Sequence, residues 1–558
     1  MIRTISGKLL LALTAAFIGA ACAGEDPQLE KALATINTDD LLEHIKVLGS
    51  DEYEGRLPSS AGEEKTIAYL VQQFEKLGLE PGNGDSWTQE VPLVSIAARP
   101  DARLSVTRTE GRRTTQLDFE YGDDIVVWTT RVVDATEAMN SEMVFVGYGI
   151  VAPEYGWDDY AGLDVEGKTV VILVNDPGFA TKDPELFTGN AMTYYGRWTY
   201  KYEEAARQGA AAALIVHETE PAAYGWNTVE GSWTGPQFSM VSEDNNMSRV
   251  AIEGWLTLET AREIFELAEL DYDELKTASM QRGFESVPMG LGAYTAVQNT
   301  IERSMSNNFL AMIPGSERPD EFVIYTSHWD HLGRDESLEG DQIYNGALDN
   351  ATGTSSLLSL AKAFKSLDTP PERSILFIAV TAEEQGLLGS AYYGENPAHP
   401  LDKTAAAINI DGLNIYGPMN DIVVVGFGAS DLDDYLAAAA KSQGRVLVPD
   451  PDAEKGYYYR SDHFSLAKQG VPALYTDTGD DHVEHGPEWT RKQKDEFTAT
   501  HYHMPSDEYR EEWDLTGALD DIKLWFLVGY TIANESSFPN WKEGSEFKAI
   551  RDGYMGTH

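Results

Sequence analysis

Residues 322–333 read FVIYTSHWDHLG, an apolar run rich in β-branched side chains that ends in two histidines and an aspartate. Three more stretches follow it: a helical pattern at 355–364 and hydrophobic runs at 375–380 and 405–410. Hydrophobic strands that alternate with helices are typical of a mostly parallel sheet covered on both faces. The sequence therefore predicts an α/β fold with a mixed, mostly parallel sheet flanked by helices.

Side chains of the types that bind metals follow the predicted strands. In open α/β sheets, ligands bind outside the carboxyl ends of the strands, so residues that close each apolar run are expected to meet at one edge. The segment NGALDN at 345–350 adds another such residue just before a helix. In chain order these residues are His328, Asp330, Asp349, Glu383, Glu384 and Asp411.

The composition indicates what a metal site in this chain could use. Eight of the eleven histidines lie between His328 and His503, and the only cysteine is Cys22. A set of imidazoles and carboxylates without thiolate suits Zn, Mn or Co, and an acidic residue shared between two sites suits a two-metal centre.

The charge balance excludes some classes of function. The 558-residue chain has 91 Asp and Glu against 42 Lys and Arg, a formal net charge of −49. Such a field repels phosphate backbones and anionic lipids, so nucleic-acid binding is disfavoured. With 42% hydrophobic and 24% charged residues, the chain is expected to be a soluble globular protein.

Residues 1–23 have the pattern of an export signal. Arg3 and Lys8 precede an apolar stretch at 9–18, and small residues follow at 19–23. Cys22 stands where a bacterial lipoprotein carries its acylated cysteine, whereas Ala21-Cys22-Ala23 also fits ordinary cleavage. We therefore expect an exported protein, periplasmic or extracellular, either freely secreted or held to a membrane through a lipid at Cys22.

The hydrophobic pattern along the sequence predicts the boundaries between domains. Two amphipathic helices are expected before Gly78, and short β-rich runs separated by turns fill the middle of the chain. The predicted parts are a signal peptide at 1–23, the first part of the main domain at 27–97, an inserted β-rich domain at 98–285, the second part of the main domain at 286–540, and a C-terminal tail at 541–558.

Taken together, the motifs resemble the secreted zinc-dependent exopeptidases, which include bacterial aminopeptidases and, more distantly, glutamate carboxypeptidase and glutaminyl cyclase. The inserted segment resembles a protease-associated domain. The motifs that carry the resemblance are HWDHLG at 328–333, NGALDNATG at 345–353, AEEQG at 382–386, NID at 409–411, SDHF at 461–464 and YHMPSD at 502–507.

The resemblance implies two zinc ions and a role for each site residue. His328 and Asp411 would bind one zinc, Glu384 and His503 the other, and Asp349 would bridge them. Glu383 would be the general base.

Other residues near the motifs receive weaker predictions. The resemblance suggests that Tyr502 donates a hydrogen bond to the oxyanion, although a packing role would also explain this tyrosine. Asp330 is expected to accept the second ring N–H of His328. Loop-orienting roles are expected for Asp462, His463 and Asp507, and surface or hydrogen-bonded roles for His331, His482, His485 and His501.

The leading hypothesis is a two-zinc aminopeptidase that acts on peptides. A carboxypeptidase would need a cationic pocket for the substrate carboxylate, and only Arg460 stands beside a matched motif. Glutaminyl cyclase chemistry is a further candidate function, and so is non-catalytic, receptor-like binding of peptides. Tyr457, Tyr458 and Tyr459 could line an apolar pocket or serve as packing, so the side-chain preference, like the oligomeric state, stays open.

Overall fold

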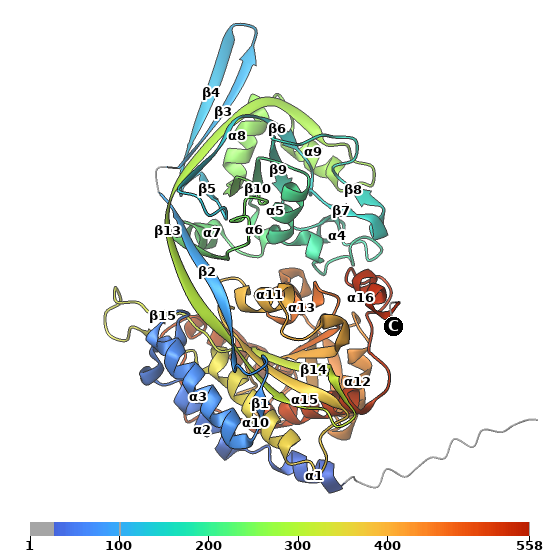
Figure 1. The fold of residues 1–558 in the computed structure, drawn as a ribbon. Helices are drawn as coiled ribbons and strands as arrows, with labels where there is room; N and C mark the ends of the chain where they lie inside the picture. The colour runs from blue at the N-terminus through green and yellow to red at the C-terminus, as the bar shows by residue number, and fades with distance from the viewer. Residues whose placement is uncertain (1–26, 100–101, 557–558) are drawn as a thin grey trace, which may run out of the picture.

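A computed structural model describes residues 27–99 and 102–556, and the predicted signal peptide lies outside them. The chain forms two lobes (Figure 1). The main lobe consists of residues 27–99 and 299–556, and the inserted lobe of residues 102–298. Within the described ranges, no helix is long and apolar enough to cross a membrane.

The sheet of the main lobe has a parallel centre and antiparallel flanks. Its central order is β17-β14-β18-β21, all parallel, with β19 antiparallel to β21 and β13 antiparallel to β17. The predicted α/β fold is therefore confirmed. The strands are β2 (Thr88–Ala98), β13 (Val287–Ile313), β14 (Arg318–His328), β17 (Arg373–Val380), β18 (Thr404–Asn409), β19 (Asp421–Val425), β20 (Val446–Pro449) and β21 (Ala473–Asp477).

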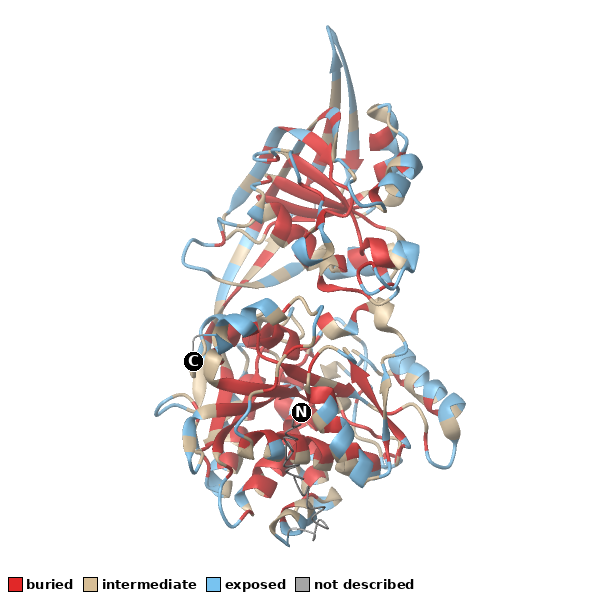
Figure 2. Ribbon diagram, turned by 90° about the vertical axis from the view of Figure 1, so that its right-hand side faces the viewer, coloured by how far each residue is buried: buried red, intermediate tan, exposed pale blue. Residues whose placement is uncertain are grey.

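Helices cover both faces of this sheet, which is why its central strands are apolar along their whole length. One face packs against the larger group of helices and the other against α11 and α13. Figure 2 shows the resulting buried centre of the lobe. The helices are α1 (Pro27–Ala34), α2 (Thr38–Leu48), α3 (Ala61–Leu77), α10 (Gly353–Lys365), α11 (Leu388–Glu395), α12 (Leu432–Ser442), α13 (His463–Ala467), α14 (Gly486–Thr500), α15 (Thr516–Asn534) and α16 (Lys548–Met555).

The N-terminal helices form where the sequence supplies their end signals. The hydroxyl of Ser60 accepts hydrogen bonds from the backbone N–H groups of Gly62 and Glu63 at the start of α3. Gly78 ends α3 with φ +78°, a conformation that side chains disfavour. The two helices predicted before Gly78 are confirmed as α2 and α3.

The inserted lobe has a parallel centre of its own. Strands β6, β9, β10 and β12 are parallel neighbours, and β5 pairs antiparallel with β12. Six helices accompany these strands, so the lobe is not built from strands alone. The elements are β3 (Arg103–Glu110), β4 (Arg113–Glu120), β5 (Ile125–Trp128), β6 (Ala135–Phe145), β9 (Thr169–Leu173), β10 (Ala212–Val216), β12 (Ile252–Leu256), α4 (Pro177–Thr181), α5 (Trp198–Arg207), α6 (Thr219–Ala222), α7 (Trp226–Trp233), α8 (Leu258–Leu267) and α9 (Tyr272–Ser279).

One long strand joins the two lobes. Between residues 287 and 298, β13 pairs with β6 and β3 of the inserted lobe, and between 299 and 309 it pairs with β2. Residues 287–298, which the sequence assigned to the main domain, therefore belong to the inserted sheet. The sequence could not show this, because one alternating pattern runs through both sheets.

The lobes also pack directly on each other. Tyr459 and Phe464 of the main lobe belong to the same buried cluster as Tyr194 of the inserted lobe, and Trp541 and Phe547 join it. The predicted C-terminal tail is thus packed against the lobes between residues 541 and 556. Loops of the main lobe are thereby held against the inserted lobe.

Candidate metal centre

Turns at the carboxyl ends of the central strands carry most of the predicted site residues. His328 is the last residue of β14, Glu383 and Glu384 follow β17, and Asp411 follows β18. Asp349 precedes α10, and His503 follows α14. Since β14 lies between β17 and β18, the side chains that end them converge.

The five predicted ligands form a continuous chain of contacts. His328 Nε2 lies 3.1 Å from Asp411 Oδ1 and 3.4 Å from Asp349 Oδ1. His503 Nε2 lies 3.3 Å from Asp349 Oδ2 and 3.1 Å from Glu384 Oε2. Asp349 therefore stands between the two histidines with one oxygen toward each. This arrangement provides two neighbouring groups of donors that share one carboxylate.

The donor set fits divalent metal ions. Three groups, each with its ligand atoms within 4.8 Å of one another, could hold a metal: His328 with Asp349 and Asp411, His331 with Asp349 and Glu384, and His328 with Glu383 and Glu384. Imidazole nitrogen and carboxylate oxygen are the ligands that zinc takes where thiolate is missing. Burial raises the pKa of Glu383 well above its ordinary value, and the neighbouring carboxylates Asp411 and Glu384 add to this rise, while the charge of His328 opposes it.

The two adjacent glutamates have different surroundings. Glu384 Oε1 lies 2.5 Å from His331 Nδ1, and its Oε2 faces His503. The carboxylate of Glu383 forms no hydrogen bond or ion pair with any residue that the structure describes. One glutamate is thus held between two imidazoles, whereas the other has no hydrogen-bond partner among the described residues.

The carboxylate of Asp330 is hydrogen-bonded to the backbone of these glutamates, and its carbonyl oxygen, not its carboxylate, is the nearer group to the ring of His328. Its Oδ1 accepts a hydrogen bond from the N–H of Glu383 at 3.1 Å, and its Oδ2 accepts one from the N–H of Glu384 at 3.4 Å. His328 Nδ1 lies 3.2 Å from the carbonyl oxygen of Asp330 but 3.8 Å from its Oδ1. The structure therefore differs from the expected carboxylate–imidazole bond, because the aspartate points its carboxylate at the turn after β17.

His331 and Arg56 are site residues that the sequence did not identify. His331 is fully buried beside Glu384, which excludes the surface role considered for it. The guanidinium of Arg56, also buried, donates hydrogen bonds to the carbonyl oxygens of Trp329, Asn345 and Gly346 and to that of Leu48. It ties together two loops that carry ligands. The only signal for His331 is its spacing in HWDHLG, and nothing marks Arg56.

The loop-orienting residues also have identifiable partners. The carboxylate of Asp507 accepts hydrogen bonds from the N–H groups of Leu348 and Asp349, each at 3.0 Å. Ser461 donates to Asp411 Oδ2 at 2.6 Å. The backbone around two ligands is therefore fixed from outside the cluster, an arrangement that keeps ligands oriented. Asp462 and His463 are buried alongside, with no partner for their side-chain polar atoms among the described residues.

Tyr502 lies at the open side of the cluster. Its ring stacks on that of His503 with centroids 3.9 Å apart, and its side chain is 40% exposed. Burial of the hydroxyl and the nearby carboxylates Asp349 and Glu384 raise the pKa of Tyr502 well above its ordinary value, so it stays a donor. The structure leaves His482, His485 and His501 out of the cluster: the first two stack on each other and pack against Trp489, and His501 contacts Ser506.

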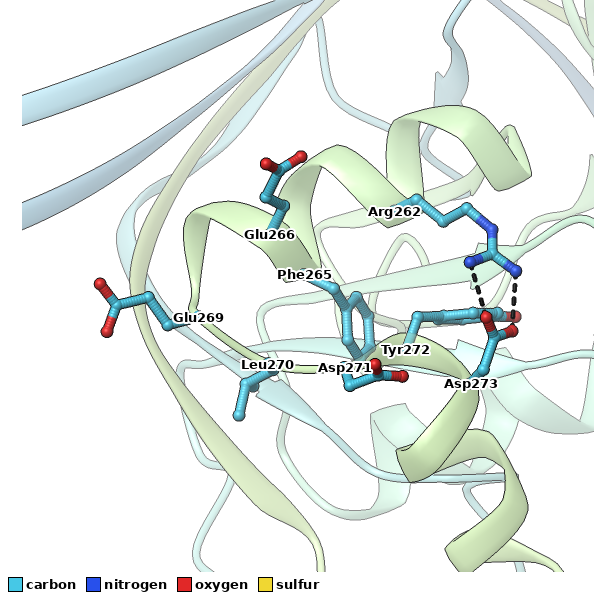
Figure 3. A pocket seen from close by; sticks show the side chains of 8 residues that line it. All are labelled: Arg262, Phe265, Glu266, Glu269, Leu270, Asp271, Tyr272 and Asp273. Atoms are coloured by element: carbon cyan, nitrogen blue, oxygen red, sulfur yellow. Dashed lines mark hydrogen bonds and ion pairs between the residues drawn. The ribbon is translucent and has the colours of Figure 1, made fainter.

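The inserted lobe contains a hollow that is separate from these residues (Figure 3). It has a volume of about 480 Å³ between α8 and α9. Arg262 and Asp273 close one side of it with paired hydrogen bonds of 2.7 and 2.9 Å. None of its lining residues belongs to a candidate metal group within the described residues. The candidate metal groups therefore all lie at the edge of the main sheet.

A comparison with known protein families finds a match over the part of the chain that carries the candidate metal centre. Residues 308–526 match the model of Peptidase family M28. This segment contains all five predicted ligands and Glu383.

The matches to individual proteins differ in how much of each chain they cover. Aminopeptidase NAALADL1 of Mus musculus is 35% identical over 137 residues, which are 23% of this chain and 17% of that protein. Probable glutamate carboxypeptidase AMP1 of Arabidopsis thaliana is 25% identical over 406 residues, 70% of this chain and 52% of that one. The chain thus spans about half or less of these relatives. The solved aminopeptidase from Aneurinibacillus sp. strain AM-1 is 19% identical with a TM-score of 0.47, and the match covers 91% of this chain and 97% of that one.

Proposed function

We propose, on the premise that residues 308–526 belong to Peptidase family M28, that this protein is a zinc-dependent aminopeptidase. It would remove N-terminal residues from peptides by attack of an activated water. The observation that carries the proposal is the position of Asp349 between His328 and His503, beside a glutamate with no partner.

The proposal assigns two zinc ions to the cluster. His328 and Asp411 would hold one, Glu384 and His503 the other, and Asp349 would be shared between them. When bound, two such ions polarise a scissile carbonyl and lower the pKa of a water nearby. His331, hydrogen-bonded to Glu384, would fix the orientation of that ligand.

Glu383 would move the proton. Its carboxylate lies beside His328 but forms no hydrogen bond with either histidine, so it would take a proton from the attacking water and return it to the leaving amine. Asp330 acts as a positioning residue, since it holds the N–H groups of Glu383 and Glu384. Tyr502 would donate its hydroxyl to the oxyanion.

The direct test is Glu383→Gln, with Glu395→Gln at an exposed position in α11 as the matched control. A free-amine peptide mixture and its N-acetylated twin are incubated with each protein and analysed by mass spectrometry, with and without a chelator. We expect stepwise loss from the free amino end that Glu383→Gln lowers by about 10²- to 10⁴-fold while zinc content is unchanged. Full turnover by Glu383→Gln would refute its role.

The same experiment separates the other candidate functions. Loss of residues from the carboxyl end indicates a carboxypeptidase. Loss of water or ammonia without shortening indicates cyclase chemistry, and one zinc per chain would agree with it. Peptide binding without any turnover in the presence of zinc indicates a receptor-like protein.

We also propose that the protein is exported. The support is the pattern of residues 1–23, which lie outside the described part of the chain. Cell fractionation followed by mass measurement of the mature N-terminus tests it. An acylated Cys22 would show a lipid anchor, cleavage after Ala23 free secretion, and an intact Met1 in the cytoplasm would contradict export.

A further inference from the structure

The inserted sheet has one covered edge and one open edge. Its strands follow the order β4-β3-β13-β6-β9-β10-β12-β5, so β4 and β5 are the edge strands. All residues of β5 are buried, and α7 packs beside it. By contrast, six of the eight residues of β4 are exposed, and no strand in the described ranges pairs with its outer side. The edge at β4 is therefore open to a further strand.

The open edge runs along a projecting hairpin. β3 and β4 form the ribbon that stands out from the inserted lobe in Figure 1, and Figure 2 shows most of it as exposed. Residues 103–107 of β3 pair with β13, and the hairpin continues beyond that strand to the turn at residues 111–112. A two-stranded ribbon without further neighbours is only marginally stable in water, so an added strand would stabilise this part of the hairpin.

Two edge strands of the main sheet are protected against such pairing. β11 (Pro236–Met240) and β20 have only five and four residues, and each includes a proline. Short strands and proline, which has no N–H to donate, are common ways to block a free edge. β4 has eight residues and no proline, so it lacks both protections.

The turn of the hairpin determines which backbone groups of β4 face outward. It has two residues, so the residues that flank it exchange both backbone hydrogen bonds across the hairpin. The pattern alternates from there, and every second residue of β4 turns its N–H and C=O away from β3. Glu120 follows this pattern: its N–H donates to Asp124 Oδ2 at 2.9 Å, and its C=O accepts from the N–H of Asp124 at 3.1 Å. The outward residues left for another strand are Thr114, Gln116 and Asp118.

The charges of β4 favour a second copy of the chain as the partner. The turn and the first residue of the strand carry Arg112 and Arg113, and the other end carries Asp118 and Glu120. All four side chains are exposed, and none forms an ion pair with a residue that the structure describes. An antiparallel copy would set the basic end of each strand beside the acidic end of the other, whereas a parallel copy would oppose like charges. β4 is therefore complementary to itself in the antiparallel orientation.

We propose that β4 pairs antiparallel with β4 of a second copy of this chain. One register lets all three outward residues pair: Gln116 lies opposite the partner's Gln116, and Thr114 lies opposite the partner's Asp118. About six backbone hydrogen bonds then join the copies, because each such pair exchanges two. Arg112 comes to lie beside the partner's Glu120. The pairing closes around a two-fold axis at Gln116 and makes one continuous sheet from the two inserted sheets.

Sedimentation velocity of the purified protein tests the pairing. The protein is measured between about 1 and about 100 μM in about 0.15 M salt, which screens its net charge of −49. Since two short strands form a small interface, we expect monomer and dimer in concentration-dependent exchange. Gln116→Pro removes an outward N–H that is not bonded to β3. It should raise the dissociation constant at least about tenfold and leave the far-UV circular dichroism spectrum unchanged. Gln116→Ala keeps the N–H and is the matched control, expected within about threefold of wild type.

Variants with reversed charges test the orientation of the strands. Arg112→Glu with Arg113→Glu makes both ends of β4 acidic, and Asp118→Arg with Glu120→Arg makes both ends basic. We expect each of these proteins alone to dimerise at least about tenfold more weakly than wild type. An equal mixture of the two should form heterodimers, because the acidic strand then pairs with the basic one.

A disulfide tests the register. In a Cys22→Ala background the chain has no other cysteine. Across the proposed axis, the Cα atoms of the two copies of residue 116 lie about 5.5 Å apart, a separation that a disulfide spans. Gln116→Cys should therefore cross-link with itself under mild oxidation. The two copies of residue 114 lie about 14 Å apart, so Thr114→Cys should cross-link only with Asp118→Cys.

Several outcomes would overturn the inference. It fails if the wild type stays monomeric throughout the concentration range, if Gln116→Pro dimerises as strongly as Gln116→Ala, or if the mixed charge variants stay monomers. Cross-linking of Thr114→Cys with itself would refute the register. The charge control is Lys182→Glu with Arg282→Glu, which reverses two exposed charges away from β4; the inference also fails if this control weakens the dimer as much as the reversals in β4 do. The peptidase assay on the same samples reports on the metal centre, so inactivity of a dimeric wild type rejects the proposed function and leaves this inference standing.

Discussion

Each lobe ends a set of parallel strands in buried ionisable side chains, but the two edges differ in their charge balance. At the edge of the main sheet, carboxylates and imidazoles face one another, and the buried guanidinium of Arg56 donates its hydrogen bonds to backbone carbonyls. At the edge of the inserted sheet, the ammonium group of Lys201 lies among Asp176 and Asp159. One edge sets its carboxylates against imidazoles, whose pKa values they raise, and the other places a lysine among its carboxylates.

The charged groups of the inserted edge have partners within the lobe. Lys201 Nζ donates to the carbonyl oxygens of Tyr148 and Asn175 at 2.7 and 2.9 Å. A cavity of about 640 Å³ opens above them, and there Glu218 is paired with Lys276 at 2.5 Å. The comparison teaches that strand topology gathers polar side chains at both edges, whereas two imidazoles that share one carboxylate form the donor set suited to a metal ion at the main edge.

The largest expected effect comes from making the same substitution at each edge. Asp349→Asn removes the carboxylate that lies between His328 and His503, and we expect kcat/KM to fall at least about 10³-fold with loss of bound zinc. Asp159→Asn, at an equally buried carboxylate of the inserted lobe, should leave both unchanged for a neutral peptide. Activity and zinc content of the purified proteins are the measurements. Equal losses in the two variants would break the contrast between the edges.

A second substitution tests whether the inserted edge depends on its own cation. Lys201→Met leaves Asp176 and Asp159 buried without their positive partner, so we expect a loss of about 3–5 kcal/mol in the stability of the inserted lobe at pH 6, where Lys201, with its pKa lowered by burial to about 7, is still charged. Urea unfolding, with hydrogen exchange of β9 and β10, measures it. Lys182→Met, at the exposed end of α4, is the control. If both variants unfold alike, Lys201 does not balance the cluster.

The pH dependence of stability sharpens the same point. Burial raises the pKa of Asp159 to about 7 from 3.8, so the folded state binds more protons than the unfolded state between these values. The stability contributed by this carboxyl is therefore lost as pH rises toward 7, and the penalty is fully present above it. Relative to Asp159→Asn, the wild-type free energy of unfolding should fall by about 2 kcal/mol between pH 5.5 and 8.5. Parallel urea curves at both pH values, without a change in the difference, would contradict it.

The position of several site residues could be predicted from the sequence, because it depends only on the order of strands along the chain. The strand runs before His328 and Asp411 place both residues at one sheet edge in any parallel arrangement. The contact of Arg56 with loops almost three hundred residues away could not be read in this way. Nor could the contact between Tyr194 and Tyr459, since it exists only after the lobes pack on each other.

The sequence also could not predict which way side chains point in the turns beyond the strand ends. Sequence order placed Asp330 beside His328, and the structure turns its carboxylate to the backbone of Glu383 and Glu384 instead. Neighbouring positions limit what a residue can reach, but the path of the turn after β17 decides what it contacts. The left-handed backbone of Ala382, with φ +54°, sets that path.

The smallest expected effect tests this detail of the turn after β17. In Asp330→Asn the amide keeps one acceptor oxygen but presents an N–H₂ group to the second backbone N–H, so one glutamate loses its anchor. We expect about a tenfold fall in kcat/KM and weaker zinc binding at the Glu384 and His503 position, with the His328 and Asp411 position little changed. Zinc titration with a competing chelator resolves the two positions. If the His328 and Asp411 position weakens instead, Asp330 acts through the imidazole after all, and the positioning of the two glutamates must come from the turn itself.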